Sequence, residues 1–404
     1  MNGEVVNGRS GGAIFPLPAT IHHCPFTFSP MPHISRLRLS HFRNYATAAL
    51  DLDARHVVLT GANGAGKTNL LEAVSMLAPG RGLRRAGFDM LAQLGGAGDW
   101  AVAATIETPD GPVDLGTGLV EGTPSRKVRI NGAAAASVEE LTEYVRLLWL
   151  TPDMDGLFRG PAGDRRRFLD RLVMTLIPGH GNSVADFDNA MRQRNRLLAE
   201  NGDPLWLDAV ETQMAEHAAA MHFSRVDTVA RLEGLCDDSV DHTAFPAAHM
   251  TLSPLFEDAT PSESSAGLEA QLLGRWRAGR HQDAAAGRTL TGPHRVDFEV
   301  MHKQKSMPAA LCSTGEQKAL LVGLVLAHAR LVADMTGIVP ILLLDEIAAH
   351  LDPARRAALF VALDALGTQC WMTGTDPVLF APAAHAARFS VTAGAIAPEG
   401  RNTP

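Results

Sequence analysis

A glycine-rich loop between an apolar run and a helical pattern restricts the possible folds more than any other feature of the chain. Residues 56–60 form a short apolar run that predicts a buried strand, and apolar residues recur at helical spacing over residues 69–77. The residues between them that fit the pattern G-x-x-x-x-G-K-[ST] are Gly61, Gly66, Lys67 and Thr68. A strand, a glycine loop and a helix in this order predict a phosphate-binding unit, because loop N–H groups and the helix N-terminus attract anions.

The whole loop is the predicted nucleotide-binding segment, and its residues are Gly61, Ala62, Asn63, Gly64, Ala65, Gly66, Lys67 and Thr68. We expect Lys67 to reach the β- and γ-phosphates of a nucleoside triphosphate and the Thr68 hydroxyl to hold Mg²⁺. The alternative is a glycine-rich turn with an exposed lysine, and the flanking strand and helix argue against it.

The second half of the chain supplies carboxylates and a helix start. Residues 341–344 are an apolar run followed directly by Asp345 and Glu346. We expect Asp345 to bind Mg²⁺ and Glu346 to act as general base toward an attacking water. Ser313, with Glu316 three residues later, forms a capping box at the start of a strong helical pattern. That helix start is either only a capping box or a site that faces a phosphate held by a second copy of the chain.

Composition excludes several classes of protein. The 404 residues are 46% hydrophobic and 20% charged, as in ordinary globular chains. The net charge of −8 means that nucleic-acid binding has to rest on a local basic patch. Four cysteines lie far apart and predict neither a zinc site nor a disulfide framework. Because no apolar run approaches the roughly 20 residues of a membrane helix, we expect a soluble, cytoplasmic protein without a membrane partner.

The predicted fold is α/β, with a P-loop core, an antiparallel β subdomain and an inserted helical arm. We expect a disordered tail over residues 1–30, with translation starting at Met31, and a flexible tail over residues 391–404. Between the tails we expect the first half of the core (31–152), the helical arm (153–287) and the second half of the core (288–390). Finer predictions include a helix from Ser137 to Val145 and a strand from Leu290 to Val300.

Taken in order, these motifs resemble the ABC-type ATPase heads and, among them, the RecF family, which is related to the SMC heads. The segments that carry the resemblance are residues 39–45 (LSHFRNY), 61–73 (GANGAGKTNLLEA), 165–170 (RRRFLD), 291–295 (TGPHR) and 313–318 (STGEQK). The resemblance covers residues 31–376, nearly the whole chain. The glycine loop alone is common to many families, whereas the combination is specific.

The resemblance implies a head that dimerises over ATP and Mg²⁺. Two nucleotides would lie between the glycine loop of one copy and the signature of the other, formed by Ser313, Thr314, Gly315 and Glu316. Asp352 would lie at the dimer interface. Such a protein would be a weak, DNA-stimulated ATPase that works as a switch in recombinational repair and replication restart. The implied partners are gapped, duplex or single-stranded DNA and the proteins RecR and RecO, and the implied task is loading recombinase at gaps.

Two loops depart from the superfamily pattern. The loop after the antiparallel subdomain reads Thr151-Pro152-Asp153, where related heads often carry a glutamine. The loop after the last predicted strand reads Thr373-Gly374-Thr375-Asp376, where they often carry a histidine. Both absences predict slow hydrolysis.

Clustered arginines are the candidates for DNA contact, and these are Arg81, Arg84, Arg85, Arg165, Arg166 and Arg167. The alternative is that they form a solvated helix face or internal ion pairs. His294 and Arg295 lie either near the nucleotide or in a structural turn, and Arg43 is a further candidate for nucleotide contact. The sequence also leaves two other functions open. The chain could be an ATP-binding subunit of a transporter or a non-catalytic, ATP-gated scaffold.

Overall fold

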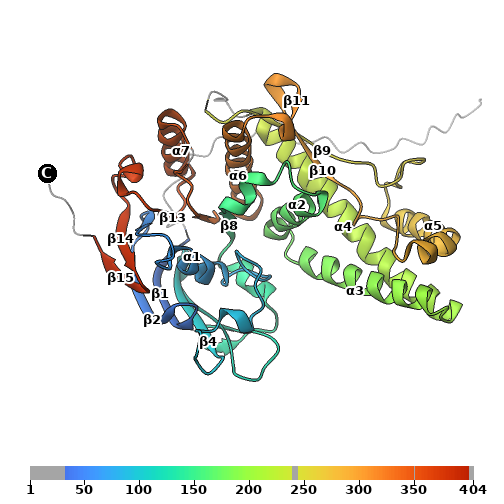
Figure 1. Ribbon diagram of the computed structural model, residues 1–404, viewed down its shortest axis with the longest axis horizontal. Coiled ribbons are helices and arrows are strands. Elements are labelled where there is room, and N and C mark those ends of the chain that lie inside the picture. The colour runs from blue at the N-terminus through green and yellow to red at the C-terminus, as the bar shows by residue number, and fades with distance from the viewer. Residues whose placement is uncertain (1–31, 239–243, 350, 400–404) are drawn as a thin grey trace, which may run out of the picture.

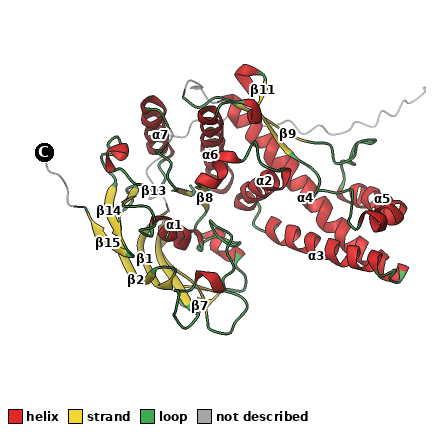
Figure 2. Cartoon of the chain, in the orientation of Figure 1, coloured by secondary structure: helices red, strands yellow, loops and turns green. Residues whose placement is uncertain are grey.

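The computed structural model describes residues 32–238, 244–349 and 351–399. Its described strands form two six-stranded sheets and one three-stranded sheet (Figure 1). Figure 2 shows the strands of the two large sheets gathered on one side of the molecule, whereas helices α3 to α5 extend to the other. The predicted tail over residues 1–30 and the start at Met31 lie outside the described residues.

The core sheet contains the strands that carry the chemistry. Its order is β15-β14-β3-β13-β12-β8, with β14, β3, β13, β12 and β8 parallel and β15 antiparallel to β14. The bounds are β3 Val57–Thr60, β8 Leu147–Leu150, β12 Ile341–Leu344, β13 Cys370–Gly374, β14 Ala387–Thr392 and β15 Ala395–Pro398. Strands β3, β8, β12 and β13 are buried along their length, as parallel strands covered on both faces require. Strand β13 lies between β3 and β12, so their carboxyl ends meet at one edge of the sheet.

The second large sheet is antiparallel, with the order β2-β1-β4-β5-β6-β7. Its strands are β1 His33–Phe42, β2 Tyr45–Asp51, β4 Trp100–Thr108, β5 Gly111–Leu119, β6 Lys127–Ile130 and β7 Ala133–Ala134. Asn131 and Gly132, both with positive φ, form the turn between β6 and β7. Helix α1 (Lys67–Ser75) shares one hydrophobic core with this sheet and the core sheet, through residues such as Leu70 and Val74.

The helices from α2 to α5 fall within the range expected for the arm. They are α2 Ala162–Leu176, α3 His180–Ala199, α4 Pro204–Asp238 and α5 Ser265–Ala286. Helices α3, α4 and α5 bury a separate core that includes Phe187, Met214 and Trp276. A buried ion pair between Arg194 and Glu211 joins α3 to α4. Helices α3 and α5 and the first part of α4 therefore form a separately packed unit, whereas α2 and the end of α4 are buried in the core shared with the core sheet.

Two helices complete the core domain. Helix α6 spans Thr314–Thr336 and α7 spans Pro353–Leu366. Helix α6 is long and apolar enough to cross a membrane by length and composition, and it is also a helix that packs against α7, α2 and α4. Burial among these elements accounts for its apolar sequence. The described 3₁₀ helices are η1 Asp89–Leu91, η2 Glu139–Glu143, η3 Pro152–Gly156, η4 Lys303–Lys305, η5 Ala309–Leu311 and η6 Pro377–Phe380.

Two predictions of local structure need correction. The helix predicted from Ser137 to Val145 is only the 3₁₀ helix η2, with no side-chain cap, and the Ser137 N–H just before it donates to the Glu140 carboxylate. The strand predicted from Leu290 begins only at Phe298, as strand β10 (Phe298–His302). It pairs with β9 (Ala248–Leu252) and β11 (Met307–Pro308) in the three-stranded sheet.

Strand β9 and the predicted C-terminal tail also differ from expectation. Strand β9 was not predicted, although its sequence AHMTL alternates apolar and polar residues, and its partner β10 is distant in the chain. The predicted flexible tail over residues 391–404 is wrong for its described part, because β15 returns along β14. Ala393 and Gly394, both with positive φ, make the turn between these strands, which is the local signal that would have predicted the hairpin.

Candidate nucleotide-binding site

The glycine loop connects β3 to α1 at the carboxyl edge of the core sheet. Gly61, Gly64 and Gly66 all have positive φ, which side chains disfavour. The Lys67 side chain is 4% exposed, and its Nζ donates to the carbonyls of Gly61 at 2.8 Å and Ala62 at 3.1 Å. The lysine is thus held across its own loop, where a phosphate would provide a stronger, charged acceptor.

The turn between β1 and β2 braces this loop. The Tyr45 hydroxyl donates to the Gly66 carbonyl at 3.0 Å, and Asn44 Nδ2 donates to the Ala65 carbonyl at 3.2 Å. A Cβ on Gly66 would lie 2.4 Å from Asn44 Nδ2 and 2.9 Å from the Tyr45 hydroxyl. The position therefore requires glycine for close approach as well as for its φ of 115°. Sequence reasoning assigned no bracing role to Asn44 or Tyr45, although both lie in the segment that carries the family resemblance.

Thr68 and Asp345 meet although they are 277 positions apart. The Thr68 hydroxyl donates to Asp345 Oδ1 at 3.0 Å, across the edge where β3 and β12 end. A hydroxyl and a carboxylate oxygen are the hard donors that Mg²⁺ prefers. The two side chains thus fit the predicted metal-binding role, with a nucleotide and water left to complete the coordination.

Glu346 lies beside the loop lysine. Its Oε1 is 3.7 Å from Lys67 Nζ, and its backbone has a φ of 50°, uncommon for a residue other than glycine. The Glu346 N–H donates to the Thr373 hydroxyl at 2.9 Å, and that hydroxyl donates to Asp345 Oδ1 at 2.7 Å. A buried threonine on β13 therefore fixes both carboxylate residues. The sequence analysis named Thr373 only because no histidine follows it, and this role of Thr373 was missed. Its place at the end of a core strand was the signal that could have indicated the role.

The Arg43 side chain donates its hydrogen bonds to groups of the protein itself. Its Nε and Nη2 donate to the two carboxylate oxygens of the buried Glu72, each at 2.8 Å, and its Nη1 donates to the Met90 carbonyl at 2.8 Å. Arg84 also contacts Glu72, at 3.4 Å, and donates to Asn69 at 2.6 Å. These contacts tie α1 to the segments around it, so the expectation that Arg43 reaches the nucleotide is not met in this structure.

The signature residues form the predicted capping box at the start of α6. The Ser313 hydroxyl accepts from the Glu316 N–H, and the Glu316 carboxylate accepts from the Ser313 N–H at 3.0 Å. Lys305, followed by the Ser313 donors, lowers the pKa of Glu316 to about 2. A Cβ on Gly315 would lie 3.6 Å from Arg355 Nη1, so the starts of α6 and α7 are neighbours.

Asp352 caps α7 at the same end of the molecule. Its Oδ1 accepts from the Arg355 N–H at 2.9 Å. Ser313, Glu316 and Asp352 are all accessible to a partner. Among the described residues, no hydrogen bond or ion pair joins the signature to residues 61–68 of the same copy. The capping box at Ser313 matches the prediction, whereas the place of Asp352 at a dimer interface and the joint action of both elements across a dimer stay predictions.

The candidate DNA contacts separate into two groups. Arg165 pairs with Asp297 through two bonds, at 2.9 and 2.6 Å, and only 16% of its side chain is exposed. Arg166 donates to the Val296 carbonyl at 3.1 Å. Arg84, with 41% of its side chain exposed, and Arg166 bind the protein through Nη1 alone, so DNA contact by these two arginines stays a prediction. The paired bonds of Arg165 favour internal ion pairing for that residue. This outcome is the internal pairing that the sequence left open.

Arg81, Arg85 and Arg167 form the remaining basic cluster, here called the loop–α2 cluster. All three are exposed, although Arg167 also pairs with Asp164. Partial burial and then the nearby charges of Arg167 and Arg81 lower the pKa of Arg85. Beneath them Arg171 packs over the rings of Trp149 and Phe168, and burial lowers its pKa to about 9. The loop after α1 and the first turns of α2 therefore present positive charge together.

His294 belongs to a structural turn. Its Nε2 lies 3.0 Å from the Thr289 carbonyl, and burial lowers its pKa to about 4. Trp276 donates to the Thr291 carbonyl at 2.8 Å in the same turn. The turn joins α5 to β10, and this contact set favours the structural alternative for His294, while Arg295 is exposed.

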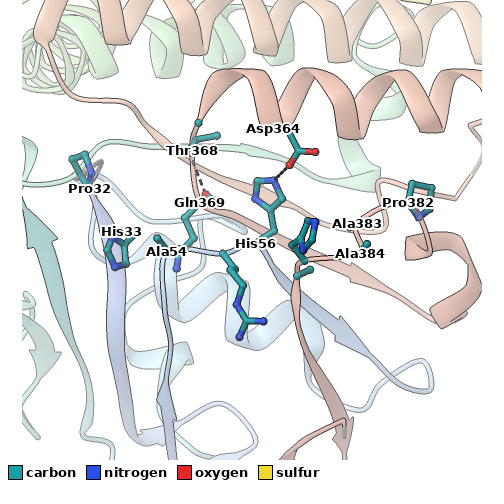
Figure 3. A pocket seen from close by; sticks show the side chains of 14 residues that line it. Pro32, His33, Ala54, His56, Asp364, Thr368, Gln369, Pro382, Ala383 and Ala384 are labelled. Atoms are coloured by element: carbon teal, nitrogen blue, oxygen red, sulfur yellow. Dashed lines mark hydrogen bonds and ion pairs between the residues drawn. The ribbon is translucent and has the colours of Figure 1, made fainter. Parts of the chain in front are cut away.

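A separate pocket of about 440 Å³ lies at the opposite edge of the core sheet (Figure 3). It is lined by residues that precede β3 and β13, including His56, Thr368 and Gln369. His56 accepts from the Cys370 N–H and contacts Asp364 at 3.1 Å. The pocket is thus at the amino ends of the strands, whereas the glycine loop, Asp345 and Glu346 are at the carboxyl ends.

Comparison with known proteins agrees with this geometry. A family described as "RecF/RecN/SMC N terminal domain" matches residues 33–394. The chain is 54% identical over 369 residues to the "DNA replication and repair protein RecF" of Rhizobium etli (strain CIAT 652), covering 90% of this chain and 98% of that protein. It is 55% identical over 361 residues to the protein of the same name from Agrobacterium fabrum, covering 88% and 96%.

Solved structures show the same fold. The "Structure of the recombination mediator protein RecF-ATPrS in RecFOR pathway" matches with a TM-score of 0.81 and 19% identity, over 92% of this chain and 99% of that one. An SMC head bound to the C-terminal winged-helix domain of ScpA matches with a TM-score of 0.54 and 14% identity, over 92% and 98%. The architecture is thus that of an ABC-type ATPase head with an inserted arm. On the sequence matches, the chain belongs to the RecF family of DNA replication and repair proteins.

Proposed function

We propose that this chain is an ATP-driven switch of recombinational repair and replication restart, which dimerises on DNA and helps to load recombinase at gaps. The observation that carries the proposal is the meeting of Thr68 with Asp345, at 3.0 Å, beside Lys67 and Glu346, at 3.7 Å. A phosphate-binding lysine, two metal-binding oxygens and a carboxylate base are the parts that hydrolysis of a nucleoside triphosphate needs.

The residues have separate roles in that reaction. The loop N–H groups and Lys67 would bind the β- and γ-phosphates. Thr68 and Asp345 would hold Mg²⁺, which when bound neutralises phosphate charge. Glu346 would accept the proton of the attacking water, with its backbone fixed by Thr373. The absence of a glutamine and a histidine in the two flanking loops supports slow turnover.

ATP-dependent dimerisation follows from the incomplete site in one copy. Among the described residues, the signature at Ser313 to Glu316 pairs with Lys305 and has no hydrogen bond or ion pair to its own glycine loop. A second copy would supply the missing phosphate contacts, and Asp352 would lie at the interface. The solved relatives named as RecF-ATPrS and RecF-ATP support the choice of nucleotide.

DNA and protein partners complete the proposal. The loop–α2 cluster would contact backbone phosphates of duplex or gapped DNA, and single-stranded DNA would be a second substrate. The RecFOR pathway named for the solved relatives supports RecR and RecO as protein partners in the cytoplasm. The identity to RecF relatives favours this function over a transporter subunit.

The test measures ATP hydrolysis across a range of protein concentrations, with and without gapped duplex DNA. We expect a weak rate that rises with the square of protein concentration and is stimulated by DNA. Glu346→Gln should abolish turnover and trap an ATP-bound dimer, as seen by size-exclusion chromatography with light scattering. Phosphate release by Glu346→Gln at the wild-type rate contradicts the catalytic role, and ATP-gated dimerisation with no hydrolysis in the wild type favours the scaffold.

A further inference from the structure

The segment at the base of the arm holds the loop that leads into the signature. Arg159, between η3 and α2, donates from Nη2 to the Cys312 carbonyl at 2.9 Å and from Nε to the Ala310 carbonyl at 3.3 Å. Cys312 is the residue directly before Ser313. One guanidinium from the arm base therefore contacts the backbone on which Ser313 is presented.

The same two carbonyls have a second donor inside the signature helix. Gln317 Nε2 donates to the Cys312 carbonyl at 2.8 Å and to the Ala310 carbonyl at 3.3 Å. Gln317 is buried, whereas Arg159 is exposed. Gln317 from the signature helix and Arg159 from the arm base therefore donate to the same loop. Of these two sets of bonds, only those of Arg159 link the loop to the arm.

A further ion pair repeats the connection one turn into α6. Lys318 Nζ lies 3.3 Å from Asp155 Oδ2, and Lys318 is only 5% exposed. Asp155 belongs to η3, the segment that occupies the place of the superfamily's glutamine loop. Segment η3 therefore contacts the signature helix of its own copy through Asp155, and Arg159, three residues after η3, contacts the loop before that helix.

Arg165 extends these contacts to the arm. From α2 it donates to the carbonyls of Phe158 at 3.3 Å and Gly160 at 2.5 Å, on both sides of Arg159. It also pairs with Asp297, whose N–H donates to Ser253 Oγ at 2.8 Å beside β9. Hydrogen bonds on both sides of Arg159, joined by the backbone of residues 158–160, therefore connect the β9–β10 sheet and α2 to the residue before Ser313.

We propose that Arg159 is a positioning residue that couples the arm to the signature and so sets how Ser313 meets the nucleotide of a second copy. The proposal rests on the proposed function, because it requires the signature to act in trans. Arg159 contacts carbonyl oxygens rather than reacting atoms, and its effect is on the geometry of the Ser313 backbone. Movement of the arm on DNA would then change the completeness of the partner's ATP site, with no change in nucleotide binding by the same copy.

The test is complementation between two inactive variants. Arg159→Ala keeps a working glycine loop and lacks a well-placed signature, whereas Lys67→Ala has the reverse defect. In a mixed dimer one composite site combines the intact loop of the first with the intact signature of the second. When equal amounts of the two variants assort at random, half of the dimers are mixed. Each mixed dimer has one working site out of two, so about a quarter of wild-type activity returns.

We expect Arg159→Ala alone to hydrolyse ATP at least tenfold more slowly than wild type, with unchanged affinity for a fluorescent ATP analogue. Arg159→Lys should stay impaired, because a single ammonium group does not reproduce two bonds of fixed geometry. Arg330→Ala, an exposed change at the far end of α6, should leave the rate unchanged. Ser313→Arg mixed with Lys67→Ala is the reference pair, since its signature defect is direct.

The outcomes separate the inference from its premise. Recovery in both mixtures supports the inference. Recovery in the Ser313→Arg mixture but not in the Arg159→Ala mixture overturns it, because Arg159 then acts on its own nucleotide or on folding. No recovery in either mixture overturns the signature's action in trans and the inference with it. Full activity of Arg159→Lys shows that the positive charge alone is needed, and this also refutes positioning by the two bonds.

Discussion

Thr373 offers the sharpest test of how the two carboxylates are held. Its buried hydroxyl donates to Asp345 Oδ1 at 2.7 Å and accepts from the Glu346 N–H at 2.9 Å. Thr373→Val keeps the shape of the side chain and removes both bonds. Thr373→Ser is the matched control, because it keeps the hydroxyl and removes only a methyl group.

The structure sets the magnitude for Thr373→Val. A hydrogen bond to a charged group contributes about 1.5–3 kcal/mol, and an unsatisfied N–H costs at least about 1 kcal/mol. We therefore expect the free energy of unfolding to fall by about 3 kcal/mol, within the stability of a typical domain. Freeing the Glu346 backbone misplaces the general base, and because a placed base contributes roughly 10²–10⁴ in rate, we expect hydrolysis about a hundredfold slower.

Two measurements check this prediction. Urea unfolding followed by circular dichroism gives the stability of each variant, and single-turnover hydrolysis of radiolabelled ATP gives the chemical step. We expect ATP affinity to change little, because Lys67 and the loop N–H groups do not contact Thr373. Equal hydrolysis rates for Thr373→Val and Thr373→Ser would refute the reasoning, since these two variants differ in the hydroxyl. A fall in rate matched by an equal fall in ATP affinity would instead indicate general damage to the site.

Two further predictions concern DNA and pH. Replacing Arg81, Arg85 and Arg167 together with alanine should reduce the slope of log K for DNA against log salt by about 2–3, at roughly 0.9 per phosphate, in a fluorescence-anisotropy titration; an unchanged slope would exclude the loop–α2 cluster as the contact surface. Burial lowers the pKa of His328 from 6.5 to about 3. As pH falls, His328 therefore binds a proton in the unfolded chain before it does so in the folded protein. The stability that neutral His328 contributes is present above pH 6.5 and is lost as pH falls toward 3. His328→Leu should therefore reduce the loss of unfolding free energy between pH 7 and 4.5, and an equal loss in wild type and variant would disprove the assignment.

Local chemistry made part of this protein predictable from sequence. The glycine loop, the apolar runs of β3 and β12 and the bounds of α7 are encoded by residues close together in the chain. Asp352 before Pro353 and Gly367 after Leu366 are start and stop signals of α7 that need no distant partner. The capping box at Ser313 is local in the same way, and its geometry is as expected.

Long-range contacts decided what the sequence left open. Arg165, Arg166 and Arg167 are adjacent, yet Arg165 binds Asp297, Arg166 binds the Val296 carbonyl, and only Arg167 joins the exposed cluster. The direction of each side chain depends on the rotation of α2 against β10, which sequence spacing does not fix. Strand β9 carries a local alternating pattern that the sequence prediction overlooked, and only its pairing with the distant β10 depended on the tertiary structure.

The site itself shows the same division. The sequence by itself determined that a phosphate loop, two carboxylates and a helix-capping serine exist, because each is a short motif with its own local chemistry. Only the tertiary structure brought Thr68 to Asp345, placed Thr373 between the carboxylates and joined Arg159 to the signature. These contacts form where strands distant in the chain end at one edge of a sheet, and the order of those strands is a property of the folded molecule.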